Sequence, residues 1–592
     1  MNEKLARLRQ LMKRHRLQAY LIPSADPHQS EYVPACWKRR QFITGFSGSA
    51  GDAVVTMNKA GLWTDSRYYL QAEQELAGSG FELFKWGLPG VPSWKDWISR
   101  ELGAGQTLGL DPRLISRKDY ADLEKLFAHK GFRLRAIEEN LVDEIWDKRP
   151  AAPSGKVFVH PKKYAGESAR SKLERLRKRM AAEAAEAHVV TQLDAIAWLF
   201  NIRGSDVAYN PVVIAYAVIT PKEARLFIDR RKLGAAAKAA LSKDAEILPY
   251  EDFPAHLAKL AARGRVWVDE TTASQWVTES LRGAKLILKP SPVPLFKAIK
   301  NQTEAEGARR AQVRDGTAMV KFLYWLENEV PKGGVTELSA ARLLEEFRSG
   351  QPLYRGLGFE TISSYAVHGA IVHYAVSPET DIPLKPEGLY LVDSGSQYWD
   401  ATTDITRTVC LGEPTDEQRD RFTRVLKGVI TLTTAAFPQG TMGPQLDILA
   451  RQALWDAGLN YGHGTGHGIG AYLGVHEGPQ SIAPARGFLI PLEPGMILSI
   501  EPGFYKDGEF GVRVENLGLV VRDEKRSTSA LAFYTFETLT LCPIDVRLIK
   551  KELLTAEEIG WLDNYHTRVR EALTPLLDAP EAAWLGRATM PA

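Results

Sequence analysis

Residues 389–408 read LYLVDSGSQYWDATTDITRT, and this stretch decides the fold class of the part of the chain that contains it. A continuous apolar run ends at Asp393, and a β-branched run begins directly after Asp404. Short apolar runs bounded by glycine and polar residues are typical of buried β-strands. The two runs therefore predict the arms of a β-hairpin, with one carboxylate near the end of each arm.

A second pair of acidic residues repeats this design further along the chain. Residues 496–503, MILSIEPG, predict a strand that ends at Glu501, and residues 511–516, GVRVEN, predict the start of another. Because strand side chains alternate between two faces, Arg513 and Glu515 should share a face.

Four carboxylates at the ends of apolar strands need compensating charge if they are buried together. Each of them alone would ordinarily be solvated or paired with a basic residue. The nearby cations are Arg407 and Arg513, and strand alternation points Arg407 away from Asp404. Taken together, the four carboxylates favour a site for divalent cations.

The glycine-rich stretch 461–470, YGHGTGHGIG, offers candidate imidazole ligands. His463 and His467 have the spacing of a zinc-binding helix, but glycine at every second position disfavours a helix. A dinucleotide-binding fingerprint is a weak alternative here, because no strand-to-helix unit surrounds the glycines. An oxygen-rich site with one or two imidazoles suits Mn²⁺, Zn²⁺ or Co²⁺ in a pair about 3.5–4 Å apart.

Composition narrows the class of protein. The chain has 592 residues, 75 Lys and Arg against 72 Asp and Glu, and 3 Cys. This balance argues against a dedicated nucleic-acid binder, and three scattered cysteines argue against a disulfide scaffold. No apolar run is long enough to span a bilayer. The sparse cysteines fit a reducing compartment, so a cytoplasmic location is expected. The basic first 16 residues are interpreted as a structural helix and not as a transit peptide.

An internal repeat predicts two related α/β domains before the hairpins. TMNKAGLWTDSR at 56–67 matches TPKEARLFIDRR at 220–231 in spacing. Proline- and lysine-rich segments at 148–164 and 289–294 mark the boundaries. We predict domains at 1–160, 161–298 and 299–592, with helices over 169–189 and 301–328 opening the second and third. Capping boxes are expected at Thr303 with Glu306 and at Thr555 with Glu558, the latter starting a helical tail.

At this point the motifs resemble a known family. VDSG, TTDITRT, HGTGHGIG, VHEGP, IEPG and VRVEN, between residues 392 and 516, are similar to those of the metal-dependent pita-bread peptidases. Residues 19–51, 62–72 and 196–212 resemble the cytosolic-type Xaa-Pro aminopeptidases (aminopeptidase P). The resemblance implies an α/β and α+β multidomain fold: two creatinase-like N-terminal domains followed by a pita-bread catalytic domain.

The resemblance also implies roles for individual residues. Asp393 would bind one metal ion, Asp404 and Glu515 would bridge both, and His467 and Glu501 would complete the ligand set of the second ion. Glu501 would also accept the proton of a water that bridges the two ions. Further catalytic or substrate-binding roles fall to His373, His463, His476, Arg67 and Arg513. Two positions depart from the family, which often has Asn at His368 and Gly at Ala401.

The expected function is therefore a metal-dependent aminopeptidase that hydrolyses the N-terminal Xaa-Pro bond. Its cofactors would be two divalent ions per subunit, Mn²⁺ first and Zn²⁺ or Co²⁺ next. The resemblance implies a homodimer acting on peptides with proline at position 2, with neither nucleic acid nor membrane as partner. A prolidase-like dipeptidase and a non-catalytic pita-bread binding protein remain as alternatives.

Overall fold

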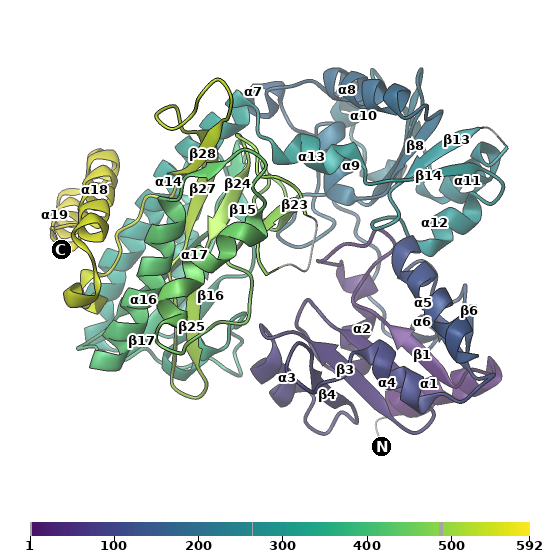
Figure 1. Ribbon diagram of the computed structural model, residues 1–592, viewed down its shortest axis with the longest axis horizontal. Helices are drawn as coiled ribbons and strands as arrows, with labels where there is room; N and C mark the ends of the chain where they lie inside the picture. Colours follow the sequence, from purple (N-terminus) through teal and green to yellow (C-terminus); the bar gives the residue numbers. More distant parts are fainter. Residues whose placement is uncertain (1–2, 263, 485–488, 592) are drawn as a thin grey trace. The chain divides into compact units, whose positions relative to one another are not determined.

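The computed structural model describes residues 3–262, 264–484 and 489–591. The chain forms two compact units (Figure 1). The N-terminal unit comprises Met1–His160 with Glu167–Val293, and the C-terminal unit comprises Pro161–Gly166 with Pro294–Ala592. The domain boundaries at residues 160 and 298 stay predictions; the first segment of the N-terminal unit ends at His160.

The N-terminal unit begins with a six-stranded mixed sheet in the order β4-β3-β2-β1-β5-β6. Its strands are β1 (Ala19–Ile22), β2 (Asp52–Thr56), β3 (Ala60–Thr64), β4 (Glu82–Lys85), β5 (Thr107–Leu110) and β6 (Arg133–Ala136). Alternate residues of β1 belong to different cores: Tyr20 packs with α1 (Glu3–Arg14), and Leu21 packs with α5 (Arg117–Lys130). Helices therefore cover both faces of this sheet, as the alternation of strand side chains requires. The other helices here are α2 (Arg39–Thr44), α3 (Tyr69–Glu75), α4 (Trp94–Glu101) and α6 (Leu141–Ile145).

A second six-stranded sheet repeats the topology of the first, in the order β12-β11-β10-β8-β13-β14. Its strands are β8 (Ala187–Val190), β10 (Ala215–Ile219), β11 (Ala224–Ile228), β12 (Glu246–Leu248), β13 (Arg265–Val268) and β14 (Lys285–Leu288). Antiparallel and parallel pairs follow one another as in the first sheet. The short sequence repeat therefore marks two copies of one supersecondary arrangement. The helices of this copy are α8 (Ala169–Ala182), α9 (Leu193–Leu199), α10 (Ala235–Leu241), α11 (Phe253–Leu260) and α12 (Gln275–Ser280).

The predicted helix over 169–189 is too long at its C-terminal end. Helix α8 stops at Ala182, and Ala184 adopts a left-handed backbone conformation with φ of 51°. The next residues enter β8, which pairs with β10 on one side and β13 on the other. Pairing on both sides of the strand outweighs the helix propensity of an alanine- and glutamate-rich sequence.

Helix α14 (Gln302–Glu329) follows α13 (Pro292–Ala298) near the start of the main segment of the C-terminal unit, close to the prediction. Its capping box is formed by Asn301 and Glu304 and not by Thr303 and Glu306, because Asn301 has the extended backbone that an N-cap requires. The capping box at Thr555 and Glu558 is confirmed, and it starts α18 (Ala556–Leu573).

Strands dominate the middle of this unit. A six-stranded sheet has the order β21-β28-β27-β24-β22-β23, and a three-stranded sheet has the order β16-β17-β20. The strands of these two sheets are β16 (Ile362–Tyr365), β17 (Leu389–Ser394), β20 (Ile405–Cys410), β21 (Phe437–Pro438), β22 (Gly466–Gly468), β23 (Glu477–Ile482), β24 (Ile497–Ile500), β27 (Asn516–Arg522) and β28 (Phe533–Thr538). Shorter sheets are formed by β15 (Tyr354–Leu357), β18 (Ser396–Tyr398) and β19 (Ala401–Thr402), and by β25 (Gly503–Lys506) and β26 (Phe510–Arg513). The remaining long helices are α15 (Glu337–Ser349), α16 (Asp416–Thr433), α17 (Gly443–Trp455) and α19 (Ala579–Ala588).

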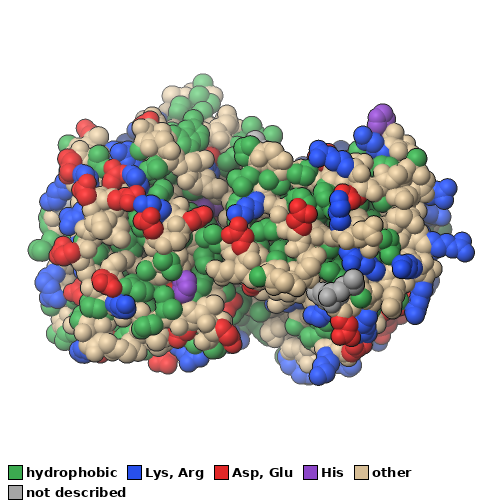
Figure 2. Space-filling model, turned by 90° about the horizontal axis from the view of Figure 1, so that it is seen from below, with side chains coloured by type: hydrophobic (Ala, Val, Ile, Leu, Met, Phe, Trp, Pro, Cys, Tyr) green, Lys and Arg blue, Asp and Glu red, His purple; other side chains and the backbone are tan. Residues whose placement is uncertain are grey.

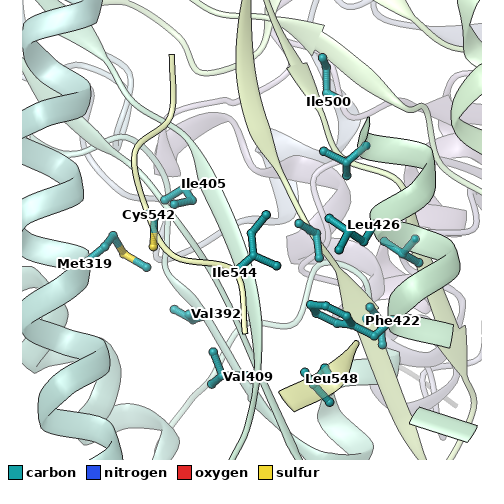
Figure 3. Packing of buried hydrophobic residues seen from close by; sticks show 14 of the residues in the cluster. Met319, Val392, Ile405, Val409, Phe422, Leu426, Ile500, Cys542, Ile544 and Leu548 are labelled. Atoms are coloured by element: carbon teal, nitrogen blue, oxygen red, sulfur yellow. The ribbon is translucent and has the colours of Figure 1, made fainter. Parts of the chain in front are cut away.

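One large hydrophobic core holds these sheets and helices together. Figure 3 shows Met319 of α14, Val392 of β17 and Phe422 of α16 among its members, all fully buried. Ile500, the last residue of β24, belongs to the same core. The strand ends that carry the acidic residues are therefore anchored on rigid packing.

Figure 2 shows acidic and basic side chains intermingled on the face it presents. Within the described residues, no helix is long and apolar enough to cross a membrane.

Candidate metal centre

The predicted hairpin is confirmed, and it brings Asp393 and Asp404 close to Glu501 and Glu515. Strands β17 and β20 pair antiparallel, with Asp393 opposite Thr406. Strand β24 pairs with β27 so that Ile500 lies opposite Asn516. Glu501 and Glu515 therefore occupy adjacent positions at the ends of the second strand pair.

The ligand atoms of Asp404, His467 and Glu515 all lie within 4.8 Å of one another. The Nε2 atom of His467 is 3.5 Å from a carboxylate oxygen of Asp404 and 3.2 Å from Oε1 of Glu501. Asp393 is held at the same place through Arg513, whose guanidinium also reaches Thr406. The structure thus brings together the five residues expected to bind metal.

Backbone contacts orient the imidazole of His467. Its Nδ1 lies 3.0 Å from the carbonyl oxygen of Gly468, which directs Nε2 to the carboxylates. The side chain of Ser499 accepts a hydrogen bond from the His467 N–H and donates one to Glu501, both at 3.0 Å. The alternating glycines permit this packing, since a Cβ on Gly466 would lie 1.9 Å from the carbonyl oxygen of Ser499.

The electrostatics of the cluster demand positive charge. Burial, and then the charges of Glu515 and Asp393, raise the pKa of Asp404 well above its usual value. Burial and the charges of Glu501 and Asp393 do the same to the pKa of Glu515. Burial opposes the charged form of His467, yet its hydrogen bond to Glu501 raises its pKa to about 9. Burial also opposes ionisation of Glu501, but the same hydrogen bond lowers its pKa to about 2.

Two carboxylate oxygens of this cluster are buried and have no hydrogen-bond partner within the described part of the chain. They are Oδ1 of Asp393 and Oε1 of Glu515. Buried polar atoms are normally hydrogen-bonded, so orphaned oxygens among four carboxylates fit the coordination of divalent cations. The residues present therefore match the donor set of a metal centre that is rich in oxygen and contains one imidazole.

Three residues that the sequence did not single out organise the centre: Thr406, Tyr505 and Ser499. The hydroxyl of Thr406 donates to Glu515 at 2.9 Å and accepts from Nε of Arg513 at 3.2 Å. The other guanidinium nitrogens of Arg513 donate to Asp393 and to the hydroxyl of Tyr505, both at 2.7 Å. Ser499 is the third of these residues. The signal for Thr406 was present, because it lies two residues after Asp404, near the start of β20.

Arg513 was expected to contact substrate, and the structure gives it a different environment. The residue is 1% exposed, and each of its three guanidinium nitrogens has an acceptor within the protein. This geometry favours a role in orienting Asp393 over direct contact with a substrate. Arg407 likewise points away from Asp404, as predicted, and donates to the carbonyl oxygen of Glu515.

His463 and His476 flank the centre. The rings of His476 and His467 are in edge-to-face contact with centroids 4.4 Å apart. His463 lies 2.8 Å from the hydroxyl of Tyr505 through Nε2, and burial lowers its pKa to about 4. His463 is therefore neutral at physiological pH and extends the hydrogen-bonded chain that begins at Arg513.

The remaining two candidates, His373 and Arg67, come from other segments of the chain. His373 follows the short helix η5 (Ala366–Ala370), which packs against β17 and β26. Arg67 belongs to the N-terminal unit, where it pairs with both oxygens of Asp65 at 2.9 and 2.8 Å. Arg231 and Asp229, their counterparts in the repeat, form the same paired arrangement.

Comparison with known families accounts for almost the whole chain. Models described as "Creatinase/Prolidase N-terminal domain" match residues 4–142 and 148–304. The model of metallopeptidase family M24 matches residues 306–522, and that of the C-terminal region of peptidase M24 matches residues 532–592. The predicted order of two creatinase-like domains followed by a pita-bread domain is confirmed.

Relatives and solved structures agree with the family models. Proteins named "Probable Xaa-Pro aminopeptidase P" from Neosartorya fischeri and Paracoccidioides brasiliensis are each 44% identical, and the alignments cover all of this chain and 92% and 99% of theirs. The crystal structure of X-prolyl aminopeptidase from Caenorhabditis elegans, described as a cytosolic enzyme with a di-nuclear active site, is 37% identical. It has a TM-score of 0.96 over 100% of this chain and 99% of that one. The chain therefore belongs to metallopeptidase family M24, among the relatives named Xaa-Pro aminopeptidase P.

Proposed function

We propose that this protein is an aminopeptidase that releases the N-terminal residue from peptides with proline at position 2, using two divalent metal ions. The observation that carries the proposal is the cluster of four carboxylates around His467, three of them buried, with orphaned oxygens on Asp393 and Glu515. Membership of family M24, with relatives and a structural neighbour named for this activity, supports the same conclusion. We propose Mn²⁺ as the metal, because the donor set is mainly carboxylate.

Asp393 would bind one ion, and Asp404 and Glu515 would bridge the pair. His467 and Glu501 would complete the ligand set of the second ion. A bound pair of divalent ions supplies an activated water and polarises the scissile carbonyl. Glu501 would accept the proton of the attacking water, and its lowered pKa keeps it ionised at neutral pH. His373 would stabilise the charge that develops on the substrate oxygen or relay a proton.

His463 and His476 would line the substrate pocket on either side of the metal ligands, and Arg513 would hold Asp393 in place. We further propose that the protein is a cytoplasmic homodimer. The cytoplasmic location is supported by the similar X-prolyl aminopeptidase structure, which is described as a cytosolic enzyme.

The test of this function is the choice of peptide. Gly-Pro-Ala should yield free glycine and intact Pro-Ala, while Gly-Ala-Ala should be cleaved about 10–200-fold less efficiently, as a pocket shaped for the proline ring discriminates. The products would be measured by mass spectrometry with Mn²⁺ present. Efficient cleavage of Gly-Pro with no cleavage of the tripeptide would instead assign a dipeptidase, and binding without turnover would contradict the proposal.

Arg67 is the proposed substrate contact in the N-terminal unit. Arg67→Ala should lower kcat/KM for tripeptides and longer substrates by about 10–100-fold, the scale of a lost charge-assisted hydrogen bond. A dipeptide lacks the main-chain oxygens beyond proline, so its cleavage should change much less. Arg231→Ala is the matched control, because it removes the same kind of pair with aspartate from the other repeat. Equal losses for dipeptides and tripeptides would show that Arg67 acts only through stability.

A further inference from the structure

The buried carboxylate of Glu337, outside the metal centre, is hydrogen-bonded to several residues of segment 365–374, which contains His373. Glu337 is the first residue of α15, and its side chain is fully buried. Its oxygens accept hydrogen bonds from the N–H of Tyr365 at 2.6 Å and from the hydroxyl of Tyr374 at 3.0 Å. Nδ1 of His368 lies 3.0 Å from both oxygens. The contacts thus fall at the start, the middle and the end of residues 365–374.

The backbone of Glu337 is itself held by hydrogen bonds to two other segments. The N–H of Glu337 donates to the carbonyl oxygen of Ile382 at 3.1 Å, and its own carbonyl accepts from the hydroxyl of Ser363 at 2.7 Å. A buried carboxylate with these partners is costly to move, because any displacement leaves charge unpaired in the interior.

His373 immediately precedes one of the anchored residues. Tyr374 donates to Glu337, and its ring stacks on that of His368 with centroids 4.4 Å apart. The segment also packs against β17 and β26 through η5, and these strands carry Asp393 and Arg513. In the chain, His373 therefore lies between η5, which packs against these strands, and Tyr374, which bonds Glu337.

Asparagine at position 368 would have its amide nitrogen where histidine has Nδ1, two bonds beyond Cβ. Either residue can donate to a carboxylate at this place, but only histidine supplies a ring to stack on Tyr374.

We infer that Glu337 and His368 are positioning residues that hold His373 in its place beside the metal centre. This inference rests on the proposed function, since it takes His373 as the group that acts on the substrate. Neither Glu337 nor His368 touches the substrate in this scheme. Their effect on the reaction passes through His373, and it should appear in kcat more than in KM.

A double-mutant cycle tests the inference in the full-length, Mn²⁺-loaded enzyme. His368→Ala should lower kcat about tenfold with little change in KM, because misplacing a catalytic group by a fraction of an ångström is costly. His373→Ala should lower kcat by about 10²–10⁴-fold. Adding His368→Ala to His373→Ala should cause no further loss beyond about twofold, since no imidazole remains to be positioned. His368→Asn, which keeps the donor, should recover most of the activity.

Controls separate positioning from general instability. Val367→Ala changes an exposed neighbour in the same helix η5 and should leave kcat unchanged. Metal content should stay at two ions in every variant, and thermal unfolding should be measured for each. If His368→Ala does not fold, Tyr374→Phe takes its place in the cycle, because it removes only the hydroxyl that bonds Glu337.

The outcomes are distinct. Multiplied losses in the double variant would overturn the inference while leaving the proposed function intact. Normal kcat in His368→Ala, with His373→Ala impaired, would do the same. Normal turnover in His373→Ala would overturn both the inference and the proposed role of His373.

Discussion

Removal of divalent metal should abolish hydrolysis of Xaa-Pro peptides, and Mn²⁺ should restore it best. The four carboxylates and His467 form a donor set for divalent cations, and the proposed attack by water depends on those ions. The measurement is release of the N-terminal residue after dialysis against a chelator, followed by titration with Mn²⁺, Co²⁺, Zn²⁺ and Mg²⁺.

The order of recovery separates affinity from activity. Zn²⁺ should bind at least as tightly as Mn²⁺, because intrinsic affinities rise across the first-row series. An oxygen-rich donor set nevertheless suits Mn²⁺, so the highest turnover should come with Mn²⁺ although Zn²⁺ displaces it at equal concentration. Full activity in protein shown to be metal-free by elemental analysis would contradict the proposed reaction.

Strand-end chemistry explains why so much of the metal centre could be predicted from the sequence. A carboxylate that follows an apolar strand lies where that strand ends, and strand pairing brings the ends of neighbouring strands close together. Asp393 and Asp404 belong to one hairpin in the sequence, and the structure pairs their strands in that way. The alternating glycines around His467 disfavoured a helix, and the structure has the short strand β22 there.

Contacts between distant segments could not be predicted in the same way. Tyr505 joins Arg513 to His463, yet nothing in its neighbouring sequence distinguishes it from a core tyrosine. The burial of Arg513 was missed for a related reason: its partners Asp393 and Thr406 lie more than a hundred residues away along the chain. Long-range partners of this kind depend on topology, and local patterns do not encode them.

The limits of local pattern also explain the two errors in secondary structure. Helix propensity favoured a helix through Val189, but pairing with Val218 of β10 and Val268 of β13 makes that residue part of a strand. Asn301 was overlooked as an N-cap because Thr303 offered the same chemistry two residues later. In both places the sequence allowed two solutions, and tertiary packing selected one.

Loss of a bridging carboxylate should be the most damaging single substitution in the centre. Asp404→Asn or Glu515→Gln should lower kcat/KM by about 10³-fold or more, since each side chain would serve two ions and the pair supplies several kcal/mol of transition-state stabilisation. His463→Ala, which removes a residue of the pocket, should cost less. Metal content by elemental analysis should fall below two ions per subunit in the bridging variants and stay at two in His463→Ala.

Stability gives a readout of the same bridge that does not depend on activity. In metal-free protein the buried carboxylates repel one another, so Asp404→Asn should leave the Tm of the metal-free form unchanged or raise it. Mn²⁺ stabilises the native state by an amount that grows with the logarithm of its affinity, so the rise in Tm on adding Mn²⁺ should be smaller in the variant. Asp206→Asn is the control, because it removes a buried carboxylate paired with Lys232 in the N-terminal unit. It should lower Tm with and without Mn²⁺ alike and leave metal content intact. An unchanged Mn²⁺-induced shift in Asp404→Asn would mean that Asp404 does not bridge the ions.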